Sequence, residues 1–149
     1  NHLAVGAVNG KVYLLGGRVG GAFISGGGNR LDLVEEYDPA SDSWSPIRAR
    51  MPTPRSAVAY GVHGGRVYVA GGEHQDYNLS TAFRAFEGFD PAKKEWTVMP
   101  PMPLQRHGLA GAVIGNRFHV VSGDVQSAGT GIEVHTDSHD AYEFENTAR

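Results

Sequence analysis

The stretch Lys11-Val12-Tyr13-Leu14-Leu15-Gly16-Gly17 decides the fold of this chain. It returns as Arg66-Val67-Tyr68-Val69-Ala70-Gly71-Gly72 and, in a weakened form, as Arg117-Phe118-His119-Val120-Val121-Ser122-Gly123. The three copies start at positions 11, 66 and 117, which are steps of 55 and 51 residues. A period near 50 residues indicates a repeat architecture. Each copy has a basic residue and then an apolar run that ends in glycine. This pattern predicts a buried strand stopped by residues that tolerate positive φ.

The composition is that of a turn-rich, all-β chain of one domain at most. Its 149 residues include 21 glycines and 8 prolines, and the formal net charge is −3. This charge gives no support to nucleic-acid binding, and no apolar run is long enough to cross a membrane. The chain has no cysteine, which excludes disulfides and thiol catalysis but leaves the cellular compartment open. It also lacks an initiator methionine, so we expect it to begin inside a longer chain.

Each unit is predicted to contain four short strands, a to d. Asn9-Gly10, a strong hairpin signal, joins the first strand a to strand b. The expected a strands cover residues 2–8, 56–62 and 108–114, and the expected c strands cover residues 31–37, 82–89 and 134–142. Loops of variable length separate b from c, and Asp-Pro turns separate c from d. Four antiparallel strands in about 50 residues predict a propeller blade.

A second marker repeats with the same period and points to a family. Tyr37-Asp38-Pro39 precedes Trp44, and Phe89-Asp90-Pro91 precedes Trp96, each shifted by 52 residues. Together with the glycine pairs, these motifs resemble the kelch repeat over nearly the whole chain. The resemblance implies a kelch-type β-propeller, which usually has six or seven blades. The third unit departs from the pattern, since Ser122 replaces a glycine and Arg149 stands where the tryptophan is expected.

The repeats divide the chain into three blades. Blade 1 is expected at about residues 1–50, blade 2 at about 51–102, and an incomplete blade 3 at about 103–149. Three blades do not close a ring. The chain is therefore interpreted as a piece of a six- or seven-bladed protein, completed by its missing blades, or as a half-propeller completed by a second copy.

Strand direction predicts which loops share a face of the propeller. The b–c loops and the starts of the a strands should lie together near the mouth of the central channel, where the kelch resemblance implies a ligand site. The candidate ligand-binding residues are Arg18, Arg55, Glu73, His74, Tyr77, Arg106, His107 and Asp124. An alternative interpretation is structural: Arg55 and Arg106 would pair with Glu73 and Asp124 to hold neighbouring blades together. The two interpretations are compatible.

The b–c loops are expected to determine which partner this chain binds, because binding residues often lie on loops that a rigid scaffold positions. Phe23, Ile24, Tyr77 and Leu79 are apolar residues in polar loops, and they either anchor a partner or fold back over their blade. The glycines of the first loop do not indicate a nucleotide, because no Gly-Lys-Ser/Thr motif follows them.

One acidic and histidine-containing segment could hold a metal ion. Glu133, His135, Asp137 and His139 alternate, so on a strand they would project to one face, and their side chains can ligate zinc or a similar ion. The alternative is a solvated or packed polar strand, since His139 aligns with the packing positions of Val34 and Phe86.

These features favour a binding or interaction scaffold that grips a peptide or protein, with no cofactor and no assigned catalytic residue. The family resemblance also implies an alternative, a carbohydrate-acting enzyme of the sialic acid mutarotase type with its site at the channel mouth. Its proton-transfer candidates are Arg55, Glu73, Arg106 and His107.

Overall fold

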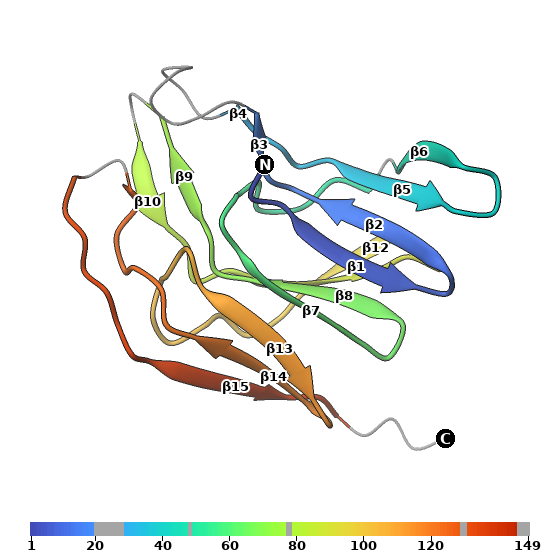
Figure 1. Ribbon diagram of the computed structural model, residues 1–149. Coiled ribbons are helices and arrows are strands. Elements are labelled where there is room, and N and C mark those ends of the chain that lie inside the picture. The colour runs from blue at the N-terminus through green and yellow to red at the C-terminus, as the bar shows by residue number, and fades with distance from the viewer. Residues whose placement is uncertain (20–28, 48, 77–78, 129–130, 146–149) are drawn as a thin grey trace.

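The computed structural model describes residues 1–19, 29–47, 49–76, 79–128 and 131–145, and these ranges contain strands and no α-helix (Figure 1). They therefore include no helix that could cross a membrane. The first sheet consists, in order, of β1 (Ala4–Val8), β2 (Lys11–Leu15), β5 (Val34–Asp38) and β6 (Ser43–Ile47). The second consists of β7 (Ala59–His63), β8 (Arg66–Ala70), β11 (Phe86–Asp90) and β12 (Glu95–Val98). The third consists of β13 (Ala110–Ile114), β14 (Arg117–Val121) and β15 (His139–Glu143).

Every pairing within these sheets is antiparallel, as expected for propeller blades. The prediction of an all-β fold with three repeated sheets is confirmed, and each b strand covers the basic residue and the apolar run of its glycine motif. Two small ribbons extend the b–c connections: β3 (Arg18–Val19) pairs with β4 (Asn29–Arg30), and β9 (Glu73–Gln75) pairs with β10 (Ser80–Ala82). The ribbons lie at the end of the molecule opposite the β1–β2, β7–β8 and β13–β14 turns (Figure 1).

The third c strand is shorter than expected. The repeat period predicts it at residues 134–142, whereas β15 covers His139–Glu143. The preceding residues are joined to the blade by a bridge between His135 and Asp124 and by further backbone hydrogen bonds, such as that from the Thr136 N–H to the Gly123 carbonyl at 3.0 Å.

The other c strands also start later than predicted, since β5 begins at Val34 instead of residue 31 and β11 at Phe86 instead of residue 82. His139 keeps their register, because each of the three lies opposite the last residue of its b strand.

Glycine lets neighbouring blades approach closely. β7 contacts both β1 and β13, so the three a strands stand side by side. A Cβ added to Gly6 of β1 would lie 2.5 Å from Val67 in the second blade, and one added to Gly61 of β7 would lie 2.8 Å from Val113 in the third. Gly71, with φ of 66°, would place a Cβ 2.6 Å from the carbonyl oxygen of Arg106. Larger residues at these positions would push the blades apart.

Two apolar cores fill the seams between the blades. The first joins Tyr13 and Leu15 to Phe89 of the second blade, and the rings of Tyr13 and Phe89 meet edge to face at 6.1 Å. The second core surrounds Phe118, which is fully buried and stacks on Phe86 at 5.7 Å. Burial of apolar surface between adjacent blades is the main stabilising contribution in such arrays.

Candidate functional site

One face of the molecule gathers equivalent residues from all three blades. Arg18, Glu73 and Asp124 each follow the glycine motif of their own blade. Each is held by the backbone to the start of strand a: the Arg18 N–H donates to the Asn1 carbonyl at 2.9 Å, and Asp124 and His107 exchange two hydrogen bonds of 2.9 Å. The same backbone geometry therefore directs these three side chains toward the face predicted from the strand directions.

Glu73 is the centre of the polar network on this face. Its carboxylate is almost fully buried and accepts hydrogen bonds from Arg18 of the first blade at 3.1 Å and from Ser127 Oγ of the third at 2.9 Å. The Ala128 N–H donates to it at 3.0 Å, and His107 Nε2 lies 3.6 Å away. One carboxylate thus connects all three blades. On the sequence alone, Arg55 and Arg106 are expected to join neighbouring blades in this way.

A polar hollow of about 300 Å³ opens beside this network. Asp124 shapes it: its carboxylate accepts the Val134 N–H at 2.9 Å and lies 3.5 Å from His135 Nδ1. His135 Nε2 is in turn 3.3 Å from the exposed Glu133 carboxylate. The lining residues are His107, Gly108, Ser122, Gly123, Asp124, Ala128, Glu133 and His135. His107 Nδ1 is buried and has no hydrogen-bond partner among the described residues.

Arg55 and Arg106 do not face this hollow. Both side chains are 0% exposed. Arg55 pairs with Glu87 at 2.6 Å and donates to the Gly71 carbonyl at 2.6 Å. Burial lowers the pKa of the Arg55 guanidinium, and the Glu87 carboxylate opposes this shift.

Arg106 is buried at the equivalent place of the third blade, where its Nε has no hydrogen-bond partner among the described residues. It donates to the carbonyls of Ser122 and Ser138, at 3.0 and 2.8 Å, and to the Asp140 carboxylate. The interpretation that the two arginines pair with Glu73 and Asp124 is therefore wrong, because each guanidinium points into its own blade and fastens strands b and c.

The remaining candidates are dispersed. His74 is buried, with Nε2 2.7 Å from Asp76 and Nδ1 without a partner in the described part of the chain. Leu79 is 49% exposed. Tyr77, Phe23 and Ile24 lie outside the described residues.

The four metal-ligand candidates do not form one group. Glu133 and His135 lie beside Asp124, and Asp137 is exposed. His139 is instead on β15, where its Nε2 lies 2.9 Å from Nδ1 of His119. Within the described ranges, no cluster of three or more His, Cys, Asp or Glu side chains is placed to hold a metal ion.

Sequence reasoning missed Glu87, Asp140 and Ser127. Glu87 and Asp140 follow the first residue of β11 and β15, the position that Glu35 holds in β5. The acidic residue that recurs at the second position of each c strand could have predicted this role for Glu87 and Asp140. Ser127 belongs to an irregular segment, and no repeat pattern marks it.

Comparison with known proteins places these observations in a family. Models of the kelch motif match residues 1–49 and 54–103. Kelch-like protein 15 of Gallus gallus is 33% identical over 121 residues, which are 81% of this chain and 23% of that protein. Kelch-like protein terF of Aspergillus terreus is 27% identical over 130 residues, 87% of this chain and 27% of that protein. The chain thus spans about a quarter of the length of these curated relatives.

A solved structure titled "Structure of YjhT" superposes on 99% of this chain with a TM-score of 0.81 and 20% sequence identity. The aligned part is 49% of that chain. At this identity the likeness concerns the fold, and it agrees with the three antiparallel blades described above. With the glycine motifs, the blade pairing and the matched kelch models in agreement, the chain belongs to the kelch-repeat family of β-propellers.

Proposed function

We propose that this chain is a binding module that holds a protein or peptide partner on the face around Glu73, and that the hollow beside Asp124 takes a basic side chain of the partner. The observation that carries the proposal is the convergence of three blades on the Glu73 carboxylate. This network makes the face rigid, and the b–c connections that vary between repeats border it. Variable loops on a rigid scaffold are a common basis of specific binding.

The charges around the hollow favour a cation. Asp124 and Glu133 line it, and the Glu73 carboxylate lies next to His107 on its rim. No lysine or arginine is among the described residues that line it. Arg18, the cation of the neighbouring network, already pairs with Glu73 at 3.1 Å. A guanidinium or ammonium group would therefore find two carboxylates, Asp124 and Glu133, whose charged neighbour within the described ranges is the His135 imidazole.

Fluorescence anisotropy with short labelled peptides tests this proposal. The probes contain a single arginine or, as a control, a single norleucine between glycine and serine residues. We expect the arginine peptide to bind more tightly and Glu133→Gln to weaken its binding at least about threefold, with stronger binding at low salt. Glu95→Gln, which changes an exposed carboxylate on β12, is the matched control. Equal affinity for both peptides would reject the basic-side-chain hypothesis.

For the carbohydrate-acting alternative, only two of the four proton-transfer candidates lie at the hollow. Glu73 and His107 lie together at the hollow, but Arg55 and Arg106 are buried and bonded within their blades. An NMR measurement of anomeric exchange on common sugar acids separates the two functions. Acceleration by the chain that is lost in His107→Ala would favour the enzyme over the binding module.

A further inference from the structure

A second polar hollow, the Arg84 hollow, lies between blades 2 and 3. It measures about 420 Å³, which is within the roughly 300–1,000 Å³ of typical ligand pockets. Residues 80–84 of the second blade line it together with Gln105 and residues 125–127 of the third. Arg84 is charged, and none of the described residues in this lining is acidic. Its charge is therefore opposite to that of the hollow beside Asp124.

Arg84 stands where the first blade has an acidic residue. Asp32 and Arg84 each lie two residues before strand c, and the carbonyl of each accepts a backbone N–H from the methionine that follows strand d. In the first blade, Asp32 pairs with Arg50 at 2.6 Å. The second blade has Pro101 in the place of Arg50. The charge at the first position is thus reversed, and the second position has no charge to balance it.

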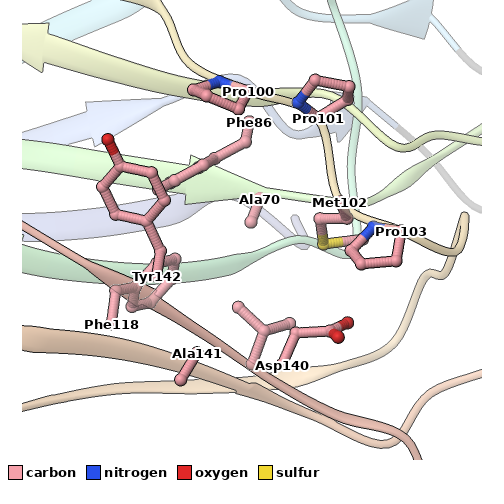
Figure 2. A pocket seen from close by; sticks show the side chains of 11 residues that line it. Ala70, Phe86, Pro100, Pro101, Met102, Pro103, Phe118, Asp140, Ala141 and Tyr142 are labelled. Atoms are coloured by element: carbon pink, nitrogen blue, oxygen red, sulfur yellow. The ribbon is translucent and has the colours of Figure 1, made fainter.

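The orientation of Arg84 is set by its contact with the chain beside it. Its Nε donates to the Met102 carbonyl at 2.5 Å. Met102 is buried in the second apolar core, and Figure 2 shows its side chain among the residues that line an apolar hollow of this seam. Because the accepting carbonyl belongs to a packed residue, the guanidinium has a defined position. Its two Nη groups take no part in this bond, and two parallel N–H donors match the two oxygens of a carboxylate.

Neutral donors complete the lining of the Arg84 hollow. Ser80 Oγ is buried and has no hydrogen-bond partner among the described residues. A buried hydroxyl without a partner costs free energy, and an acceptor in the hollow would remove this cost. The side-chain amides of Gln105 and Gln126 can donate as well. One guanidinium with hydroxyl and amide donors around it suits a ligand with anionic oxygen atoms.

We propose that the Arg84 hollow is a carboxylate-binding site. Arg84 donates two charge-assisted hydrogen bonds to the carboxylate, and Ser80 and the two glutamine amides donate to its remaining lone pairs. The carboxylate belongs either to an acidic side chain of a polypeptide or to a free organic acid, since both have the same recognition chemistry. The described lining shares no residue with the hollow beside Asp124. This proposal therefore does not depend on the binding function proposed there.

An NMR titration of the ¹⁵N-labelled protein tests the site. One probe is an acetylated and amidated peptide with a single glutamate between glycine and serine residues, and its control has glutamine in place of the glutamate. We expect the glutamate peptide to shift the amide signals of residues 80–84 and 125–127 saturably. Its Kd should be at least about threefold lower than that of the control, because hydrogen bonds to a charged acceptor are the stronger ones.

Propionate, which carries the same carboxylate without a peptide, is the second probe. Tighter binding of the glutamate peptide assigns the site to a polypeptide side chain, whereas equal or tighter binding of propionate at the same residues assigns it to a free acid. The proposal would be overturned by equal affinity for the two peptides together with no shift by propionate. Shifts confined to other residues would also overturn it.

A matched pair of variants tests the role of the guanidinium. Arg84→Gln should weaken binding of the carboxylate probe at least about threefold, and Arg84→Lys should restore only part of it, because an ammonium lacks the paired donors. Lys93→Gln makes the same change in charge on the exposed turn between β11 and β12 and should leave the affinity unchanged. An equal effect of Arg84→Gln and Lys93→Gln would show that only net charge matters, which contradicts a site at Arg84.

The same variants separate this site from the hollow beside Asp124. Glu133→Gln should not change the affinity for the glutamate peptide, and Arg84→Gln should not weaken binding of the arginine peptide. Failure of one proposal therefore leaves a distinct result for the other.

Discussion

Arg55 Nη1 lies 2.6 Å from Glu87 Oε2 in the interior of the second blade, where 0% and 2% of the two side chains are exposed. Thr53 Oγ1 donates to the other carboxylate oxygen at 2.6 Å, and Arg55 Nε and Nη2 donate to the carbonyls of Gly71 and Val69 at 2.6 and 3.0 Å. The arginine therefore fastens the segment before strand a to strands b and c of the same blade.

Removal of one partner from this pair should strongly destabilise the fold. We expect Glu87→Ala to lower the free energy of unfolding by about 3–5 kcal/mol, because it leaves the buried Arg55 cation without a counter-charge. Asp32→Ala, which breaks the exposed pair with Arg50 at 2.6 Å, should cost less than about 1 kcal/mol. Urea unfolding measures both values. Similar costs would show that burial does not govern the strength of these pairs.

The two tryptophans of strand d should differ in their importance for stability. Trp96→Phe loses the hydrogen bond to Ala49 and part of the packing on the first core, which we expect to cost about 2–3 kcal/mol. Trp44→Phe changes a side chain that is 55% exposed and should cost less than about 1 kcal/mol. Thermal or urea unfolding monitored by circular dichroism compares them. The prediction fails if the Trp44 variant is the less stable of the two.

The glycine pair can be tested by adding a single methyl group. Gly71→Ala should lower the free energy of unfolding by more than about 2 kcal/mol, since its Cβ would lie 2.6 Å from the Arg106 carbonyl oxygen. Gly64→Ala has a similar φ of 55° but no atom within 4 Å of the added Cβ. It should show only the cost of the left-handed conformation, about 1 kcal/mol. Urea unfolding of both variants measures the difference, and equal costs would contradict the close approach of the blades.

Tyr13 should make stability fall at alkaline pH. Burial and the hydrogen bond to Glu36 raise the pKa of its phenol to about 12. Between pH 10 and pH 12 the unfolded chain releases this proton while the folded chain keeps it, so stability is lost as the pH rises. Tyr13→Phe should lessen this loss between pH 9.5 and pH 11.5, as measured by urea unfolding. The same slope in both proteins would show that Tyr13 does not contribute to it.

Much of the fold could be predicted because the same apolar and glycine pattern occurs three times in the chain. A single apolar run such as Val67–Ala70 fits several structures, but three runs that end in the same glycine motif fit a blade. All three c strands were predicted to start three to five residues too early. Apolar residues such as Leu31 and Val134 precede the strands, and residue type alone does not show where the pairing with strand b begins.

The sequence predicted which face of the propeller holds the candidate residues, but it did not predict their hydrogen-bond and ion-pair partners. Strand direction placed Arg18, Glu73 and Asp124 together, since it depends only on the alternation of antiparallel strands. The partners of Arg55 and Arg106 could not be deduced in this way. The choice between Glu73 and Glu87 depends on which way a buried guanidinium turns, and that is decided by the backbone carbonyls around it.

The close approach at Gly6 and Gly61 has no exact equivalent in the third blade. The same register position in the third blade is Ala112, opposite His119 where the other blades have tyrosine. The third blade also carries Ser122, with φ of 60°, where the first two have glycine. A blade shaped to fit against Gly6 would therefore meet an extra methyl group on this face. The repeats look alike in sequence, but their sides are not interchangeable, so one blade could not replace another without a change in the side-chain packing at the seam.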